Sequence, residues 1–381
     1  MKKLGIYIHI PFCESKCYYC DFVSFKKSDN EKLKYVQSLV NEIKYKAKTL
    51  KNYEIDSIFI GGGTPSCLPT GCLLKIFKQL RMSLNINKDC EISVEANPNS
   101  ITEQFLDEIK NCEVNRISIG LQSSNNDLLK QINRIHTKED FNLALNLISK
   151  FCFKNINVDL MIGLPNQTIK DVIDSIDFVK DKVTHISCYG LILEENTRLY
   201  DMVGSGQLTL PSEDESNKMY EVAYNYLKEN EFYRYEVSNF CKQGYECRHN
   251  LKYWNRDEYI GFGLNSSSFI NNERYSNEIN FNKYIESFSD NKNIKDIKLN
   301  LESLLIKDEI DEFVMLQLRT AYGLNVKNLI DKYNYDILKI KENEIKKLAS
   351  SNLIEIENNF LKVTNKGFFV LNQIIIMLLC D

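Results

Sequence analysis

Short apolar runs alternate with amphipathic stretches through the first half of the chain. Six runs have the length and the β-branched content of strands: residues 4–10, 55–60, 91–94, 114–119, 156–162 and 185–191. The first intervening stretch places Val36, Leu39, Val40 and Ile43 on one helical face. Because a connection between parallel strands must be long enough to carry a helix, the alternation predicts a parallel sheet covered by helices.

Capping boxes mark where several of these helices begin. In such a box, the first residue and an acidic residue three positions later satisfy free backbone N–H groups of the first turn. The predicted boxes are Ser28/Glu31, Ser100/Glu103, Thr137/Asp140, Thr168/Asp171 and Ser212/Glu215.

An open sheet and a barrel both satisfy this pattern. Glu95, Asp159 and His185 lie within or at the end of otherwise apolar strands, as expected where strands line a reactive cavity. This favours an α/β fold with an incomplete, TIM-like (β/α)6 barrel over residues 1–205. The alternation then stops, and a barrel extension over 206–295 is predicted, with an extended stretch at 233–240.

The last part of the chain, residues 296–381, has a different pattern. Helices are expected through Phe313, Leu316 and Leu318, over 326–333 and over 337–349. A hairpin of 353–356 and 360–363, turned at Asn358 and Asn359, is expected to follow. Three helices and a hairpin predict a winged-helix-like module, for which we expect a structural or lid role. The charged stretch 290–298 is the predicted linker, and 374–379 is a terminal helix.

Charge and cysteine content narrow the possible functions. With 48 Lys and Arg residues against 52 Asp and Glu residues, the net charge of −4 disfavours nucleic acid as a partner. No secretory leader is recognisable, so we expect a cytoplasmic protein whose 12 cysteines stay reduced. Buried apolar packing is the expected state of Cys67, Cys72, Cys90, Cys112, Cys152, Cys188, Cys241 and Cys380.

Three cysteines lie within eight residues, immediately after the first predicted strand. They are Cys13, Cys17 and Cys20. A structural zinc site normally has four ligands, and no further Cys or His pair follows at finger-like spacing. Thiolates also hold iron–sulfur clusters, usually one per iron, so three cysteines would leave one iron of a four-iron cluster open to a small molecule.

A glycine run, Gly61-Gly62-Gly63-Thr64-Pro65, follows the second predicted strand. Its spacing differs from that of a dinucleotide fingerprint. Taken alone, it is typical of a tight strand-to-helix turn. Beside the cysteine loop, it also allows a ligand to approach the backbone, since glycine has no side chain in the way.

The C-x3-C-x2-C spacing resembles that of radical-SAM proteins. The resemblance implies a 4Fe-4S cluster bound by Cys13, Cys17 and Cys20, and S-adenosylmethionine on its open iron. It further implies that this cosubstrate contacts Tyr7, Tyr19, Gly62, Gly63, Thr64, Glu95, Gln122, Arg134 and Asp159. An arginine can pair with the methionine carboxylate, and carboxylates can accept hydrogen bonds from ribose hydroxyls.

The words Gly-Ile-Tyr-Ile-His-Ile-Pro-Phe-Cys and Asp-Leu-Met-Ile-Gly-Leu-Pro resemble the oxygen-independent coproporphyrinogen III oxidase family. Its oxidase branch carries a further cysteine two positions past the third and a longer N-terminal arm. Here Phe22 stands at that position and only twelve residues precede Cys13. Both departures favour the heme chaperone branch. The implied partners are heme or another tetrapyrrole and an acceptor protein that could be membrane-associated; oxidative decarboxylation and heme modification are the alternatives.

The stretch His249-Asn-Leu-Lys-Tyr253-Trp254 agrees with that branch, where it is associated with heme binding. Imidazole is a common axial ligand of heme iron. Without the resemblance, we would expect His249 to cap a turn and the two aromatic residues to fill a domain junction. Two departures from the family pattern stand out: Asn133 occupies a glycine position, which asparagine tolerates, and Asn265-Ser-Ser-Ser lacks a histidine. His9 could support the cysteine loop or pack in the core.

Overall fold

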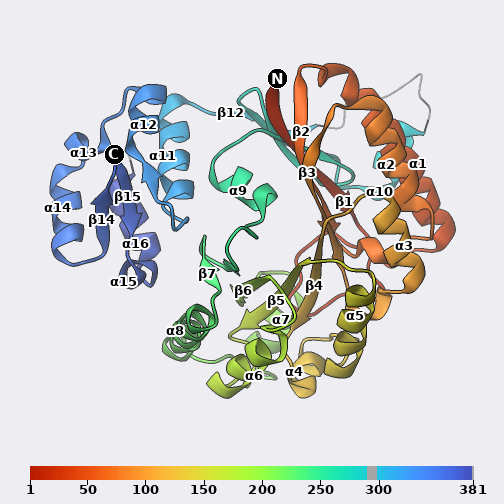
Figure 1. The fold of residues 1–381 in the computed structure, drawn as a ribbon, viewed down its shortest axis with the longest axis horizontal. Helices are drawn as coiled ribbons and strands as arrows, with labels where there is room; N and C mark the ends of the chain where they lie inside the picture. The colour runs from red at the N-terminus through yellow and green to blue at the C-terminus, as the bar shows by residue number, and fades with distance from the viewer. Residues whose placement is uncertain (290–297, 380–381) are drawn as a thin grey trace.

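The computed structural model describes residues 1–289 and 298–379 (Figure 1). The predicted linker at 290–298 therefore lies, except for its last residue, outside the described residues, as does Cys380.

The six predicted strands are all present and parallel. Their observed bounds are β1 Lys2–Ile10, β2 Tyr53–Gly62, β3 Ile86–Ala96, β4 Arg116–Gln122, β5 Asn155–Ile162 and β6 His185–Gly190. They pair in chain order from β1 to β6. The helices that connect them are α1 Asp29–Lys46, α2 Cys72–Ser83, α3 Glu103–Asn111, α4 Asn126–Gln131, α5 Lys138–Lys150 and α6 Ile169–Val179. Figure 1 shows these helices along the outer side of a curved sheet, so the predicted incomplete barrel is confirmed.

Alternation along the strands, interrupted by register shifts in β2 and β4, separates an apolar outer face from a mainly polar inner one. On β1, for example, Ile6, Ile8 and Ile10 are fully buried in the main hydrophobic core, beneath the helices. Full burial of such a side chain contributes about 1.5–3 kcal/mol. The residues between them, Tyr7 and His9, face the barrel interior. The apolar face holds the fold, and the inner face is left free to carry chemistry.

Four of the five predicted capping boxes are observed, at Ser28, Thr137, Thr168 and Ser212. The box predicted at Ser100/Glu103 is wrong. Residues Pro98–Ser100 form a short 3-10 turn, and the helix is capped instead by Thr102, whose side chain accepts from the Phe105 N–H. The rigid ring of Pro98 favours this extra turn before the helix.

The sheet continues on both sides of the six strands. The segment predicted as extended, 233–240, is a short hairpin that pairs antiparallel with β6 rather than one strand. At the other edge, β9 pairs parallel with β1, and three antiparallel strands follow. The elements of this extension are α7 Arg198–Gly204, α8 Glu213–Glu229, β7 Tyr233–Arg234, β8 Asn239–Cys241, α9 Arg248–Trp254, β9 Tyr259–Phe262, β10 Ser267–Ile270, β11 Glu273–Ser276, α10 Phe281–Phe288 and β12 Leu299–Ser303.

The C-terminal module has a hydrophobic core of its own. Its elements are α11 Ile306–Gln317, β13 Leu324–Asn325, α12 Val326–Tyr333, α13 Ile337–Ile340, α14 Glu342–Ser350, β14 Ile354–Glu357, β15 Phe360–Val363, α15 Asn365–Phe368 and α16 Leu371–Leu378. The hairpin turn at Asn358 and Asn359 is confirmed, with φ of 50° and 67°. The single helix expected over 337–349 is instead two, α13 and α14, because the backbone leaves the helical region at Lys341. Among the described residues, no helix is long and apolar enough to cross a membrane.

Buried ion pairs attach this module to the rest of the chain. The Arg256 side chain, only 2% exposed, pairs with Glu312 at 2.6 Å and with Glu309 at 3.2 Å. Arg274 also pairs with Glu312. Arg256 follows α9, and both glutamates lie on α11, so these pairs fix the module against α9.

We expect Arg256→Met to lower the free energy of unfolding by about 3 kcal/mol, because it leaves two partly buried carboxylates without their main partner. Chemical denaturation measures this loss. Lys170→Met is the control, since it breaks the exposed pair with Asp174 and should cost less than about 1 kcal/mol. Equal losses in the two variants would contradict the proposed role of Arg256.

Candidate functional site

The cysteine loop is fixed by main-chain hydrogen bonds to the end of β2. The Gly63 N–H donates to the Ile10 carbonyl at 2.9 Å, and the Thr64 N–H donates to the Phe12 carbonyl at 2.7 Å. Across the loop, the Cys13 N–H donates to Phe25 O at 3.1 Å. Backbone pairing therefore holds the loop over the carboxyl ends of the strands.

Close packing explains the glycine run. A Cβ on Gly63 would lie 2.6 Å from the carbonyl oxygens of Ile10 and Phe12. A Cβ on Gly62 would lie 2.2 Å from His9 Nδ1, and its φ of 101° already disfavours other residues. His9 in turn bonds the Val23 carbonyl, just after the cysteine loop, through Nε2 at 3.1 Å. Of the two possibilities for this residue, the bond favours support of the loop.

A cavity of about 380 Å³ opens beside this loop at the carboxyl ends of the strands. Most of the predicted cosubstrate residues line it, together with the three thiols: Cys13, Cys17, Cys20, Tyr19, Gly62, Gly63, Thr64, Glu95, Gln122, Arg134 and Asp159. The sequence places these residues up to about 146 positions apart, from Cys13 to Asp159. Parallel strands bring them together because their carboxyl ends meet at one edge.

Arg134 links the cysteine loop to the strands. Its Nη1 donates to Cys17 Sγ at 3.4 Å, and its Nη2 donates to the Gly120 carbonyl at 2.6 Å and to Asn97 Oδ1 at 3.0 Å. Asn97 also donates to Thr64 Oγ1, which lies 3.4 Å from Cys13 Sγ. The network places a permanent positive charge beside the thiols.

Two carboxyl groups face the same cavity. Burial raises the pKa of Glu95 to about 7, and the nearby charge of Asp159 adds to the effect. Burial also raises the pKa of Asp159, although Asn157 donates a hydrogen bond to it at 2.8 Å. Ionised carboxyl groups in this setting need a donor or a positive charge to satisfy them.

Three buried polar atoms in the cavity wall have no hydrogen-bond partner among the described residues. They are Ser24 Oγ, Gln122 Oε1 and Arg134 Nε. Gln122 also has a φ of 70°, a left-handed conformation that few non-glycine residues adopt. Unsatisfied buried groups cost about 1–3 kcal/mol each, so the wall is suited to a polar ligand that would supply their partners.

The three cysteine thiols are better suited to hold an iron–sulfur cluster than a single metal ion. Burial raises the pKa of Cys20 to about 11 and raises that of Cys13, so both need a positive centre to become thiolates. Within residues 1–289 and 298–379, no three Cys, His, Asp or Glu side chains are arranged to hold one metal ion. In a four-iron cluster each cysteine binds a different iron, so the thiols need not converge.

The remaining predicted residues lie below the cavity. Tyr7 does not line it; its hydroxyl is 3.0 Å from His9 Nδ1, and its ring stacks on Phe59. His185, expected to line the cavity, is fully buried instead, with ring nitrogens bonded to Asn157 and Tyr235. It sits at the start of β6, whereas the cavity lies at the strand ends.

His249 also lies at the amino-terminal side of the barrel. Its Nδ1 is 2.9 Å from Ser57 Oγ, its Nε2 is 2.9 Å from Tyr253 OH, and its ring stacks on Phe59. The side chain is 1% exposed, and burial lowers its pKa to about 3. Both ring nitrogens already have partners in the core, and heme contact by this residue stays a prediction.

Sequence reasoning missed Asn97, Met161 and Tyr189, which also line the cavity. Their position in the sequence could have identified them, since each lies at or just after the end of a strand.

The expectation of buried packing is wrong for two cysteines. Cys152 is exposed and Cys67 is only partly buried, whereas the other described members of that set are buried. Asn133 has a φ of 60° as expected, and its side chain also donates to Ser15 and Lys16 in the cysteine loop.

Comparison with known proteins agrees with this geometry. Residues 7–179 match the Radical SAM superfamily, and residues 306–370 match the HemN C-terminal domain. Over 98% of both chains, the sequence is 37% identical to "Heme chaperone HemW" from Buchnera aphidicola subsp. Schizaphis graminum. It is 34% identical to the Lactococcus lactis protein of that name, over all of this chain and 98% of the relative. The chain belongs to the HemW family of radical-SAM proteins.

A solved structure supports the fold of this HemW family member. The coproporphyrinogen III oxidase HemN from Escherichia coli matches with a TM-score of 0.85, covering 99% of this chain and 90% of that one, at 21% identity. The two chains therefore share the barrel and the C-terminal module. At this identity, the likeness concerns the fold alone.

We expect Glu95→Gln to change the pH dependence of stability. The pKa of Glu95 in the folded state, about 7, is above its ordinary 4.5. The contribution of this shift to the free energy of unfolding is therefore complete below about pH 4.5, and it is lost as the pH rises through 7. The neutral glutamine should make the ligand-free variant more stable than the parent at pH 8, by up to about 3 kcal/mol.

Thermal melting at pH 5 and pH 8 measures the difference. Glu103→Gln, on the exposed start of α3, is the control and should leave the pH profile unchanged. A Glu95→Gln variant that melts at the same temperature as the parent at both pH values would contradict the raised pKa.

Proposed function

We propose that Cys13, Cys17 and Cys20 bind a 4Fe-4S cluster and that the adjoining cavity binds S-adenosylmethionine. The observation that carries this proposal is the common cavity: the three thiols share one space with two carboxyl groups and a partly buried arginine. Such a cluster supplies an electron and an open iron. The chain supplies the ligands, the orientation of the cosubstrate and a partly enclosed cavity.

The polar wall suggests a role for each residue. Arg134 carries the charge that a methionine carboxylate would pair with. The free Gln122 Oε1 and the carboxyl groups of Glu95 and Asp159 are acceptors for hydroxyl and amino groups. Gly62, Gly63 and Thr64 let the backbone approach the ligand. Tyr19 forms part of the wall, while Tyr7 supports it from below through His9.

We further propose that the chain is a heme chaperone, binding heme and passing it to an acceptor protein. The name of its relatives supports this choice, and so does Phe22, which stands where the oxidase branch carries a further cysteine. Phe22 lines the cavity and is 59% exposed, so a large apolar ring borders the space beside the thiols. The alternatives are oxidative decarboxylation of coproporphyrinogen III and radical modification of heme.

An anaerobic assay separates these functions. The reconstituted protein, with S-adenosylmethionine and a reductant, is offered coproporphyrinogen III or heme. A chaperone should bind heme, release it unchanged to an acceptor, and leave coproporphyrinogen intact. Formation of the divinyl product would overturn the chaperone proposal in favour of the oxidase, and a modified heme would favour the third function.

We expect Cys17→Ser to lose most of its iron and sulfide after anaerobic reconstitution, because a serine hydroxyl is a poor ligand for a soft iron site. Chemical iron and sulfide assays and the visible absorption of the cluster measure the loss. Cys152→Ser is the matched control, since Cys152 is an exposed cysteine outside the cavity. Equal cluster content in both variants would rule out Cys17 as a ligand.

A further inference from the structure

A chain of buried hydrogen bonds runs from the cavity beside the cysteines through the interior of the barrel. Asn157 donates through Nδ2 to Asp159 Oδ1 at 2.8 Å, and its Oδ1 lies 2.5 Å from His185 Nδ1. The other ring nitrogen, His185 Nε2, lies 2.8 Å from the Tyr235 hydroxyl. Asn157, His185 and Tyr235 are at most 3% exposed, so bulk water does not compete for these bonds.

Strand register brings these residues together. Asn157 and Asp159 lie two positions apart on β5, so they share one face of the sheet. Their partners across on β6 are His185 and Ser187. The Ser187 hydroxyl donates to Asn157 Oδ1 at 3.0 Å. Four polar side chains therefore adjoin inside the barrel, where apolar side chains would pack without needing hydrogen-bond partners.

Each group in this chain is oriented by its neighbour. A carboxylate only accepts hydrogen bonds, so Asn157 must turn its NH2 group toward Asp159 and its oxygen toward His185. His185 then donates through Nδ1. Burial lowers the pKa of His185 well below its ordinary value, so the ring is neutral and Nε2 accepts from the Tyr235 hydroxyl. Reversing any one group would place two donors or two acceptors face to face.

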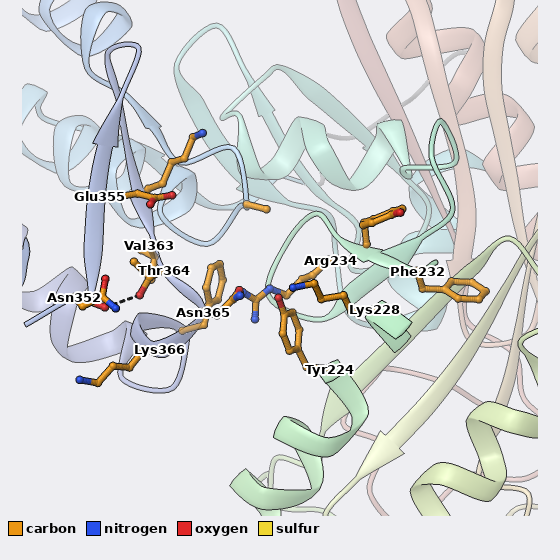
Figure 2. A pocket seen from close by; sticks show the side chains of 14 residues that line it. Tyr224, Lys228, Phe232, Arg234, Asn352, Glu355, Val363, Thr364, Asn365 and Lys366 are labelled. Carbon is orange, nitrogen blue, oxygen red and sulfur yellow. Dashed lines mark hydrogen bonds between the residues drawn. The ribbon is translucent and has the colours of Figure 1, made fainter. Parts of the chain in front are cut away.

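The C-terminal module holds the hairpin that carries Tyr235. The Tyr235 carbonyl accepts from the Ala321 N–H at 2.9 Å. Its neighbour Arg234 donates to Asn365 at 3.1 Å, and its guanidinium lies 3.5 Å from the ring centre of Phe368. Figure 2 shows Arg234 reaching toward the module across the cavity between α8 and the module. These contacts fix the backbone from which the Tyr235 hydroxyl reaches His185.

We propose that Tyr235 and His185 are positioning residues for cosubstrate binding: they orient Asn157, which in turn holds Asp159 as an acceptor at the cavity. This inference rests on the proposed binding of S-adenosylmethionine, and it names residues that support the cosubstrate without touching it. A carboxylate offers about four acceptor positions, so the bond from Asn157 leaves Asp159 able to accept from a ligand. The polar character of His185 is explained although the residue lies outside the cavity.

The affinity of the full-length protein for S-adenosylmethionine tests this proposal. The protein is reconstituted anaerobically, and binding is measured by equilibrium dialysis without reductant. His185→Leu removes the donor to Asn157 and should weaken binding about ten-fold. His185→Asn places an amide N–H near the position of Nδ1 and should bind within about three-fold of the parent.

A role in packing alone predicts the opposite order for these two variants, because leucine fills the space of an imidazole better than asparagine does. Binding by His185→Leu as tight as that of the parent would overturn the proposal.

A double-mutant cycle shows whether His185 acts through Asp159. Asp159→Ala alone should weaken binding about ten-fold. Adding His185→Leu to Asp159→Ala should then change the affinity by less than about two-fold, because the contact that His185 supports is already absent. Losses that simply multiply in the double variant would contradict the positioning role.

Tyr235→Phe tests the far end of the hydrogen-bond chain with a milder change. It removes the hydroxyl that donates to His185 and should weaken binding about three-fold. Tyr226→Phe is the matched control, since the Tyr226 hydroxyl donates to Asp177 outside the cavity, and it should bind as the parent does. This pair decides the result if the His185 variants do not fold, and equal affinity in the two variants would then overturn the proposal.

The outcomes separate this inference from the proposed function. If the parent contains its cluster and does not bind S-adenosylmethionine, the proposed cosubstrate site fails and the inference fails with it. If the parent binds and only Asp159→Ala weakens binding, the cosubstrate site stands and the positioning role fails. All of these variants should keep the iron content of the parent, because the three cysteines are unchanged.

Discussion

Two backbone hydrogen bonds hold the cysteine loop over the open end of the barrel, and the rest of the site depends on them. Gly63 and Thr64 donate to the carbonyls of Ile10 and Phe12, so the residues that follow β1 and β2 move as one unit. The bonds require glycine, because a Cβ on Gly63 would occupy the space of both acceptors. The glycine run thus has a packing function before any ligand is considered.

The two faces of the barrel strands have different roles: the outward face packs in the core, and the inward face carries the side chains of the site. Outward residues such as Ile8 and Val94 are fully buried and build the main core. Most inward residues are polar, and their position along the strand decides which end of the barrel they reach. Glu95 faces the cavity, while Glu91, four positions earlier, accepts from the backbone N–H groups of Arg248 and His249 at the start of α9. The same strand, β3, therefore contributes a carboxyl group to the cavity at one end of the barrel and holds α9 in place at the other end.

Local patterns in the sequence predicted the elements well, and contacts between distant segments less well. The six strands followed from their apolar runs, and the Asn358-Asn359 turn followed from its place between two strand-like runs. In the structure both asparagines are left-handed. Pro98 displaced one capping box by inserting a turn. His185 is polar within an apolar strand, as Glu95 is, yet it faces the lower core, because depth along the barrel is set by register between strands.

The other conclusions depend on one proposal: three thiols hold a four-iron cluster, and one iron is left free for a ligand. Electron paramagnetic resonance of the reduced, anaerobically reconstituted protein tests it directly. We expect a cluster signal that shifts when S-adenosylmethionine is added and that does not shift in Arg134→Gln, which keeps the three cysteines. A cluster signal indifferent to S-adenosylmethionine, or protein that takes up zinc in place of the cluster, would contradict it.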